Sequence, residues 1–153
     1  MPTVSRTFSV DLPPARVIEY LKDFANAQEW DPGTQSCTRS DDGPIAESAE
    51  WHNVSKIFGV TAELTYVLQK ATDSMLVFVG RNKSSTSTDN ITVDASGTGS
   101  TLTYRADLEM HGAAKVLNPV MKLAFEKLAN DTQSQMTTVL NGLAAGGESR
   151  PRS

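Results

Sequence analysis

The sequence predicts a single α+β domain in which antiparallel strands pack against helices on one face. Three observations support this prediction. A helical segment follows an initial strand, a strand-rich stretch fills roughly residues 34–110, and an amphipathic helix lies between about Gly112 and Leu143. No segment inside the strand-rich stretch is long enough for a crossover helix. Consecutive strands are therefore expected to be antiparallel neighbours.

The first strand is predicted over Thr3–Val10, where apolar residues share one parity and Arg6 is the exception. Two prolines at positions 13 and 14 suit the first turn of a helix, because proline lacks only an N–H that would be unpaired there. The apolar face of this helix is formed by Val17, Tyr20, Leu21 and Phe24. A short additional turn is expected before the break at Trp30-Asp31-Pro32-Gly33.

About six strands are predicted from Thr34 to Met110. Alternation is clearest in Thr61–Lys70 and Thr101–Met110, which indicates strands with one buried face. Met75–Val79 is apolar on both parities, as in a strand that is covered on both sides or closely flanked. Two further strands are expected over Ala46–Val54 and Ser84–Asp94.

The closing segment carries one apolar stripe at steps of three and four residues, which is typical of a helix lying on a core. Asn118 and Pro119 suit the cap and first residue of its main part, predicted to run to about Asn141. A short helical lead-in from Ala113 and a bend are expected before it. The predicted domain covers residues 1–143, followed by a disordered tail over residues 144–153.

The composition of the chain argues against several classes of function. The chain has 153 residues and a net charge of −4, which argues against nucleic acid as a partner. No apolar run approaches the ~18 residues of a membrane span and no signal segment is present, so a cytoplasmic protein is expected. Cys37 is the single cysteine, which excludes an intrachain disulfide and a zinc site built from several thiolates.

Two groups of residues resemble a known family. The first is Val17–Phe24 followed by Trp30–Gly33. The second is Gly97–Leu108, leading through Gly112 to Asn118-Pro119. In these segments the chain resembles the START-like, or Bet v 1-related, superfamily, and it is most similar to small bacterial members described as polyketide cyclase/dehydrase-like.

The resemblance implies a helix-grip fold. This is a seven-stranded antiparallel sheet curved around a long C-terminal helix, with two short helices after the first strand. Members of the superfamily mostly bind hydrophobic small molecules, some are cyclases or aromatases, and some assist protein folding. The motifs specify the fold and leave the chemistry open.

A ligand site is expected between the sheet and the C-terminal helix, where residues of inward parity meet the helix stripe. The predicted ligand-binding residues are Trp51, Tyr66, Phe78, Tyr104, Leu108, Leu117, Met121, Phe125 and Leu128. The pattern leaves the direction of Trp51 open, since either it or His52 points inward. A solid core without a cavity is the alternative interpretation. No cofactor and no metal are predicted.

His52 and Asp89 are the candidate catalytic residues. Histidine titrates near neutral pH and could act as a general base, although a surface histidine is the simpler interpretation. Asp89 shares parity with Ile91 and Val93 and could face a cavity, where burial would raise the pKa of its carboxyl. A position near solvent at a strand end is nevertheless the simpler interpretation of Asp89. Cys37 is interpreted as a buried inert thiol.

Three functions remain open at this point. The preferred one is a non-catalytic carrier or sensor of a lipid or polyketide-like molecule, acting as a monomer or homodimer. A cyclase or aromatase-type enzyme would use the same cavity, and an interaction module would present an exposed apolar patch. A buried carboxylate or histidine in the cavity would favour the enzyme, and a purely apolar cavity would favour the carrier.

Overall fold

The computed structural model describes residues 3–57, 60–112 and 118–146. Strand β1 is followed by two short helices and a 3-10 turn, then by six strands and one long helix. The elements are β1 (Thr3–Val10), α1 (Pro14–Lys22), η1 (Phe24–Asn26), α2 (Ala27–Trp30), β2 (Thr34–Arg39), β3 (Glu50–Ile57), β4 (Val60–Ala71), β5 (Met75–Arg81), β6 (Ser85–Ser96), β7 (Gly99–Met110) and α3 (Asn118–Gly146).

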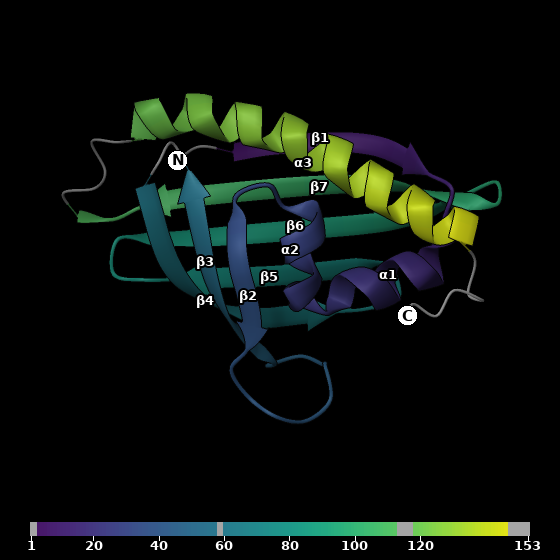
Figure 1. Cartoon of the computed structure of the whole chain (residues 1–153), viewed down its shortest axis with the longest axis horizontal. Coiled ribbons are helices and arrows are strands. Elements are labelled where there is room, and N and C mark those ends of the chain that lie inside the picture. Colours follow the sequence, from purple (N-terminus) through teal and green to yellow (C-terminus); the bar gives the residue numbers. More distant parts are fainter. Residues whose placement is uncertain (1–2, 58–59, 113–117, 147–153) are drawn as a thin grey trace.

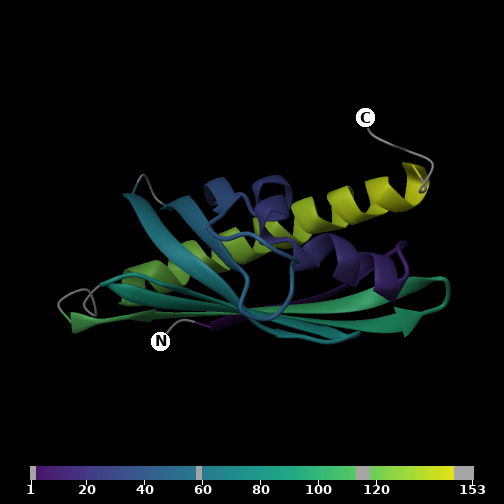
Figure 2. The same ribbon diagram turned by 90° about the horizontal axis from the view of Figure 1, so that it is seen from below.

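The seven strands form one antiparallel sheet in the order β1-β7-β6-β5-β4-β3-β2. All helices lie on the same side of this sheet, and α3 runs along it over β1 (Figure 1). Seen from below, the sheet is bent, so that β2, β3 and β4 rise toward the side of the helices (Figure 2). The predicted helix-grip architecture, including the antiparallel order of consecutive strands, is confirmed.

Alternating burial along the strands defines the inner face. On β7 the inward residues are Leu102, Tyr104, Ala106 and Leu108. On the neighbouring β6 they are Ser85, Ser87, Asp89, Ile91 and Val93. The inner face therefore changes along the sheet from apolar side chains at one end of β6 to hydroxyl and carboxyl groups at the other.

Arg6 explains the polar exception in the first strand. It has the inward parity of β1 and pairs with Tyr104 of β7. Its Nη2 lies 3.0 Å from Glu126 Oε1, and its Nε donates to Asn130 Oδ1 at 3.0 Å. These contacts hold α3 to the edge strand β1. Hydrogen bonds and ion pairs have a defined geometry, so they fix the position of the helix more specifically than an apolar side chain would.

Two boundaries differ from the sequence prediction by four residues or more. Helix α3 begins at Asn118 as expected but continues to Gly146, because Leu143 and Ala144 pack against the core. The strand predicted from Ala46 begins only at Glu50, since Ser48 has φ 83°, which is incompatible with an extended strand. Residues 144–146, predicted to belong to the disordered tail, are thus helical. The predicted lead-in from Ala113 and the rest of the tail, from residue 147, lie outside the described residues. Within the described ranges, no helix combines the length and the apolar character needed to cross a membrane.

The turn between β6 and β7 requires a glycine at position 99. A Cβ atom there would overlap with the carbonyl oxygen of Val10, so the backbone of β1 or β7 would have to move. Gly99→Ala is therefore expected to lower the free energy of unfolding by roughly 1–3 kcal/mol. Urea unfolding followed by circular dichroism measures this change.

Gly142 in α3 is the matched control, because a Cβ atom at that position would meet nothing within 4 Å. Gly142→Ala is expected to raise the free energy of unfolding by about 0.4–1 kcal/mol, as alanine favours the helix. Equal stability of the two variants would show that the close approach at Gly99 does not constrain the turn.

Candidate functional site

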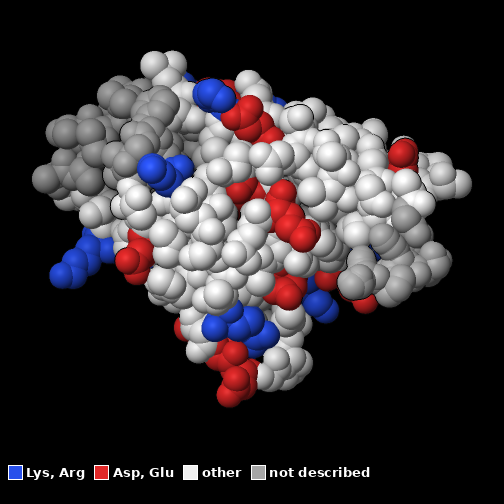
Figure 3. All heavy atoms as spheres, in the orientation of Figure 1, with Lys and Arg blue, Asp and Glu red and all other residues white. Residues whose placement is uncertain are grey.

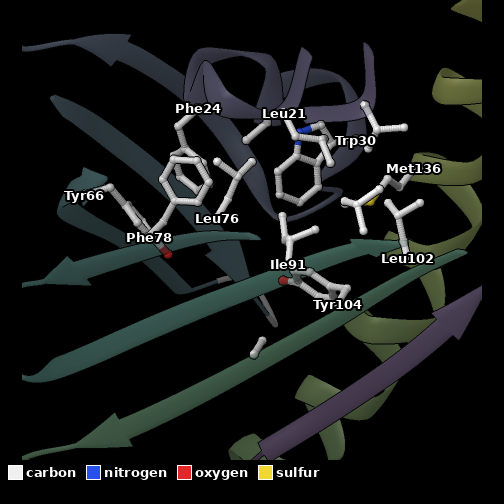
Figure 4. Close-up of a cluster of buried hydrophobic side chains, with 14 of the residues drawn as sticks. Leu21, Phe24, Trp30, Tyr66, Leu76, Phe78, Ile91, Leu102, Tyr104 and Met136 are labelled. Carbon is white, nitrogen blue, oxygen red and sulfur yellow. The ribbon is translucent and has the colours of Figure 1, made fainter. Parts of the chain in front are cut away.

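The interior between the sheet and the helices contains an aromatic cluster centred on Phe24. The 3-10 turn η1 places this side chain over the sheet, with its ring centroid 4.5 Å from those of both Tyr66 and Phe78. Trp30 and Trp51 meet the same ring edge-on at 6.0 and 6.1 Å. Figure 4 shows Phe24, Trp30, Tyr66 and Phe78 in the layer between the helical segments and the strands of the sheet. Rings packed in this way provide a rigid apolar wall.

Tyr66 lies across the neighbouring strand because its partner in the register is a glycine. Tyr66 on β4 pairs with Gly80 on β5, and a Cβ atom at Gly80 would lie only 2.6 Å from the ring. The hydroxyl of Tyr66 forms a hydrogen bond with the side chain of Ser87 on β6. The absence of a side chain at position 80 thus lets the tyrosine bring its polar end to the middle of the sheet.

Asp89 is the charged group of this interior. It lies in the middle of β6, paired with Phe78 on one side and Ala106 on the other, and is 5% exposed. The hydroxyl of Tyr104 donates to Asp89 Oδ1 across 3.5 Å, which is the long limit for a hydrogen bond. The described residues therefore give this carboxyl one weak partner, where a buried carboxylate usually has several.

Burial in this apolar layer raises the pKa of Asp89 to about 8, and the nearby charge of Asp31 adds to the effect. The hydrogen bond from Tyr104 acts in the opposite direction but does not offset it. Burial, followed by the charge of Asp89, raises the pKa of the hydroxyls of Tyr66 and Tyr104 well above the usual value. At neutral pH the three groups are thus mainly protonated.

Asp31 and Trp30 come from the break after α2. Asp31 Oδ1 accepts from the backbone N–H of Gly33 at 3.1 Å, and Oδ2 accepts from Thr34 Oγ1 at 2.9 Å. Burial raises the pKa of this carboxyl, although both hydrogen bonds lower it. Trp30 is fully buried, and its Nε1 has no hydrogen-bond partner among the described residues. An unpaired buried donor of this kind is costly.

The structure brings together most of the predicted ligand-binding residues. Tyr66, Phe78, Tyr104, Leu108 and Phe125 are buried in the interior, and Leu128 is partly buried against it. Leu117 and the side chain of Met121 lie outside the described residues. The role of every predicted residue in ligand binding stays a prediction.

Trp51 points inward and is fully buried on β3. Its Nε1 donates to Asp23 Oδ1 at 3.2 Å, and the guanidinium of Arg39 lies 5.5 Å from the ring centroid. These contacts join β2, β3 and η1, so Trp51 anchors the short helices to the sheet.

His52 lies on the opposite face of β3. Its Nε2 is 2.8 Å from Glu63 Oε1, and both side chains are exposed. The exposed side chain agrees with the simpler interpretation of His52 as a surface histidine, and the outer face of β3 does not bring it to Asp89. A catalytic role for His52 stays a prediction. The expectation that Asp89 lies near solvent at a strand end is wrong, because β6 extends well beyond it on both sides.

Cys37 is buried on β2, and burial raises the pKa of its thiol to about 11. A protonated thiol is a poor nucleophile, in agreement with its interpretation as inert. Among the described residues, no group of three or more His, Cys, Asp or Glu side chains is arranged to hold a metal ion. On the face shown in Figure 3, acidic and basic side chains are interspersed among uncharged ones.

Sequence reasoning missed Trp30 Nε1, the Tyr66–Gly80 pair and the proximity of Asp31 to Asp89. The parity of Asp89 was the one available signal. The other features depend on the register of strands that are distant in sequence and on the path of the chain after α2.

The raised pKa of Asp89 has a consequence for stability. In the unfolded chain an aspartate ionises at about 3.9. Between that pH and about 8, unfolding releases a proton, so the free energy of unfolding falls as the pH rises. Asp89→Asn carries no charge in either state. The variant is expected to gain stability relative to the native chain as the pH rises from 5 to 8, by up to roughly 1.4 kcal/mol per pH unit.

Urea unfolding at pH 5, 6, 7 and 8 tests this expectation. Asp94→Asn, on the same strand with an exposed side chain, is the matched control and is expected to change stability little at any pH. A stability difference between Asp89→Asn and the native chain that does not vary with pH would contradict the assignment.

The chain is similar to known proteins in sequence and in structure. The family described as polyketide cyclase/dehydrase and lipid transport matches residues 1–146. No curated protein matches the chain.

Solved structures with the same fold are distant in sequence. A START superfamily protein from Mycobacterium smegmatis is 14% identical, with a TM-score of 0.76 over 92% of this chain and 98% of that one. A protein from Thermus thermophilus is 13% identical, with a TM-score of 0.77 over 95% and 100%. The Zhui aromatase/cyclase from a Streptomyces species is 12% identical, with a TM-score of 0.73 over 94% and 93%. The match over almost the whole length shows that the chain belongs to the polyketide cyclase/dehydrase and lipid transport family.

Proposed function

We propose that this protein binds a largely apolar small molecule between the sheet and α3, with Asp89 and Tyr104 contacting its polar end. The observation that carries the proposal is the Asp89 carboxyl, which is buried in an apolar layer with one partner at 3.5 Å. A buried polar group without good partners costs free energy unless something else pairs with it. A bound molecule with one polar group would supply that partner.

The surroundings of Asp89 fit such a ligand. Aromatic rings of Phe24, Tyr66, Phe78 and Trp30 form the apolar wall, and two tyrosine hydroxyls lie within it. Small-molecule sites usually combine apolar walls with a few placed polar groups. The family description and the aromatase/cyclase among the similar structures support the same class of ligand.

Native mass spectrometry of freshly purified protein, followed by organic extraction, tests whether a hydrophobic molecule is carried. A matched pair of variants on α3 then tests its place. Leu128 packs partly buried against the core, and Leu123 is 73% exposed. Leu128→Trp is expected to fill space beside Gly33 and to weaken binding of an apolar fluorescent probe by about tenfold or more, roughly 1.4 kcal/mol.

Leu123→Trp on the outer side of the same helix is expected to leave binding unchanged. Circular dichroism verifies that both variants fold. Equal affinity of the two variants for the probe would show that the ligand does not lie between α3 and the sheet.

A second candidate function is favoured by the pKa of Asp89, which burial raises to about 8. In an aldol cyclisation, the carbon between two carbonyl groups loses a proton and forms a carbon–carbon bond with a third carbonyl carbon, whose oxygen takes up a proton; loss of that hydroxyl as water then gives the aromatic ring. A carboxyl that titrates near neutral pH can accept the first proton or donate the second. Asp89, with Tyr104 beside it, would then be the acid–base group of a cyclase acting on a polyketide-like substrate.

The substitution Asp89→Asn distinguishes a binding function from a catalytic one. If the protein is an enzyme, Asp89→Asn is expected to lower turnover of a short poly-β-ketone thioester by roughly 10²–10⁴-fold while the thioester still binds. Absorbance of the aromatic product measures turnover. Binding of the thioester without any product from the native protein would favour the carrier.

A further inference from the structure

We propose that the buried end of the ligand is an uncharged group with a hydrogen-bond-accepting oxygen, such as a ketone, and that the site rejects carboxylate and phosphate head groups. This inference rests on the proposed binding function. It divides the class of hydrophobic ligands in two, because free fatty acids and phospholipids carry an anionic end whereas neutral carbonyl compounds do not.

The first argument is the kind of polar atom that meets in the interior. Asp89 of β6, Tyr104 of β7 and Tyr66 of β4 all project from the inner face of the sheet. The hydroxyl of Tyr104 lies 3.5 Å from Asp89 Oδ1, and the charge of Asp89 contributes to the raised pKa of Tyr66. Each of the three offers an O–H group when protonated, and O–H groups bind an acceptor oxygen.

The second argument is the sign of the charges. Five ion pairs of lysine and arginine side chains among the described residues lie elsewhere: Arg6 with Glu126, Arg39 with Asp41, Arg105 with Asp107, Lys122 with Glu126 and Lys127 with Asp131. None of these cations pairs with Asp89. An anionic ligand would meet the carboxyls of Asp89 and Asp31 in an apolar layer, with no described basic partner to offset its desolvation.

The protonation state agrees with the geometry. Burial raises the pKa of Asp89 to about 8, so at neutral pH its carboxyl mainly carries a proton that it can donate to a ketone oxygen. A cationic amine would instead require the ionised carboxylate and would gain nothing from the O–H groups of the tyrosines as donors. The neutral acceptor is therefore favoured over the amine.

A matched series of probes with one apolar body tests the proposal. The probes are 2-ethylnaphthalene, 2-acetylnaphthalene, 2-naphthoate and 2-naphthylmethylamine, each measured at pH 7 by displacement of an apolar fluorescent dye. The ketone is expected to bind about tenfold more tightly than the ethyl compound, and the carboxylate at least tenfold more weakly than the ketone. The amine is expected to bind more weakly than the ketone.

Variants then assign the selectivity to Asp89. Asp89→Leu removes the donor, so the ketone should bind no better than the ethyl compound. Asp89→Asn, which retains an N–H donor and a similar shape and is uncharged like the protonated acid, should keep both ketone binding and the discrimination against the carboxylate. Asp94→Asn should behave as the native chain. If Asp89→Leu does not fold, the affinity for the ketone at pH 7 and pH 9.5 decides: it should fall with pH in the native chain, whose Asp89 carboxyl then loses its proton, and stay constant in Asp89→Asn.

The outcomes separate this inference from the proposed function. Binding of 2-ethylnaphthalene with equal affinity for ketone and carboxylate would overturn the inference and leave the binding function intact. Tightest binding of the amine would overturn it in favour of a cationic ligand. No displacement by any probe would overturn both.

Discussion

A single antiparallel sheet has one face that must be kept from water, and in this protein α3, α1 and α2 cover it (Figures 1 and 2). The sheet bends toward these helices, and the contacts that hold them come from few residues. Arg6 fixes the middle of α3 to β1, and Trp51 ties η1 to β3 through Asp23. Phe24 fills the space between them with its ring. The buried interior of the protein therefore lies between the inner face of the sheet and these helices.

Within that covered face, the protein retains a group that does not favour stability. An apolar residue at position 89 would continue the pattern of Ile91 and Val93, whereas Asp89 is buried with one long hydrogen bond. Polar groups placed in this way are costly, and they are characteristic of functional sites. Protonation reduces the free-energy cost of burying this carboxyl, because the neutral form loses less solvation than the ionised form. Burial accordingly raises the pKa of Asp89 to about 8. Stability and the proposed chemistry therefore depend on the same proton.

The family to which the chain belongs joins lipid transport with polyketide cyclisation in its description. Both activities need an apolar interior, and they differ in what the polar end of the molecule requires. A lipid head group needs compensation of its charge, whereas a cyclisation needs a group that moves a proton. The described interior holds a carboxyl with a raised pKa and two tyrosine hydroxyls, Asp89, Tyr104 and Tyr66, and these are the groups on which the proposals for binding and for catalysis both depend.

The sequence by itself determined the order of elements and the antiparallel meander, because periodicity and turn residues are local signals. It placed Asp89 on the parity of Ile91 and Val93, and it placed Tyr66 and Tyr104 with the buried residues. The tertiary structure alone decided which side of β3 carries Trp51 and which carries His52, where α3 ends, and that Gly80 makes room for Tyr66. These features arise from contacts between residues far apart in the chain, and a pattern along one strand contains no information about its partner. Burial of the Asp89 carboxyl likewise depends on strands and helices on every side of it, so its chemistry could be suspected from the sequence but not assigned.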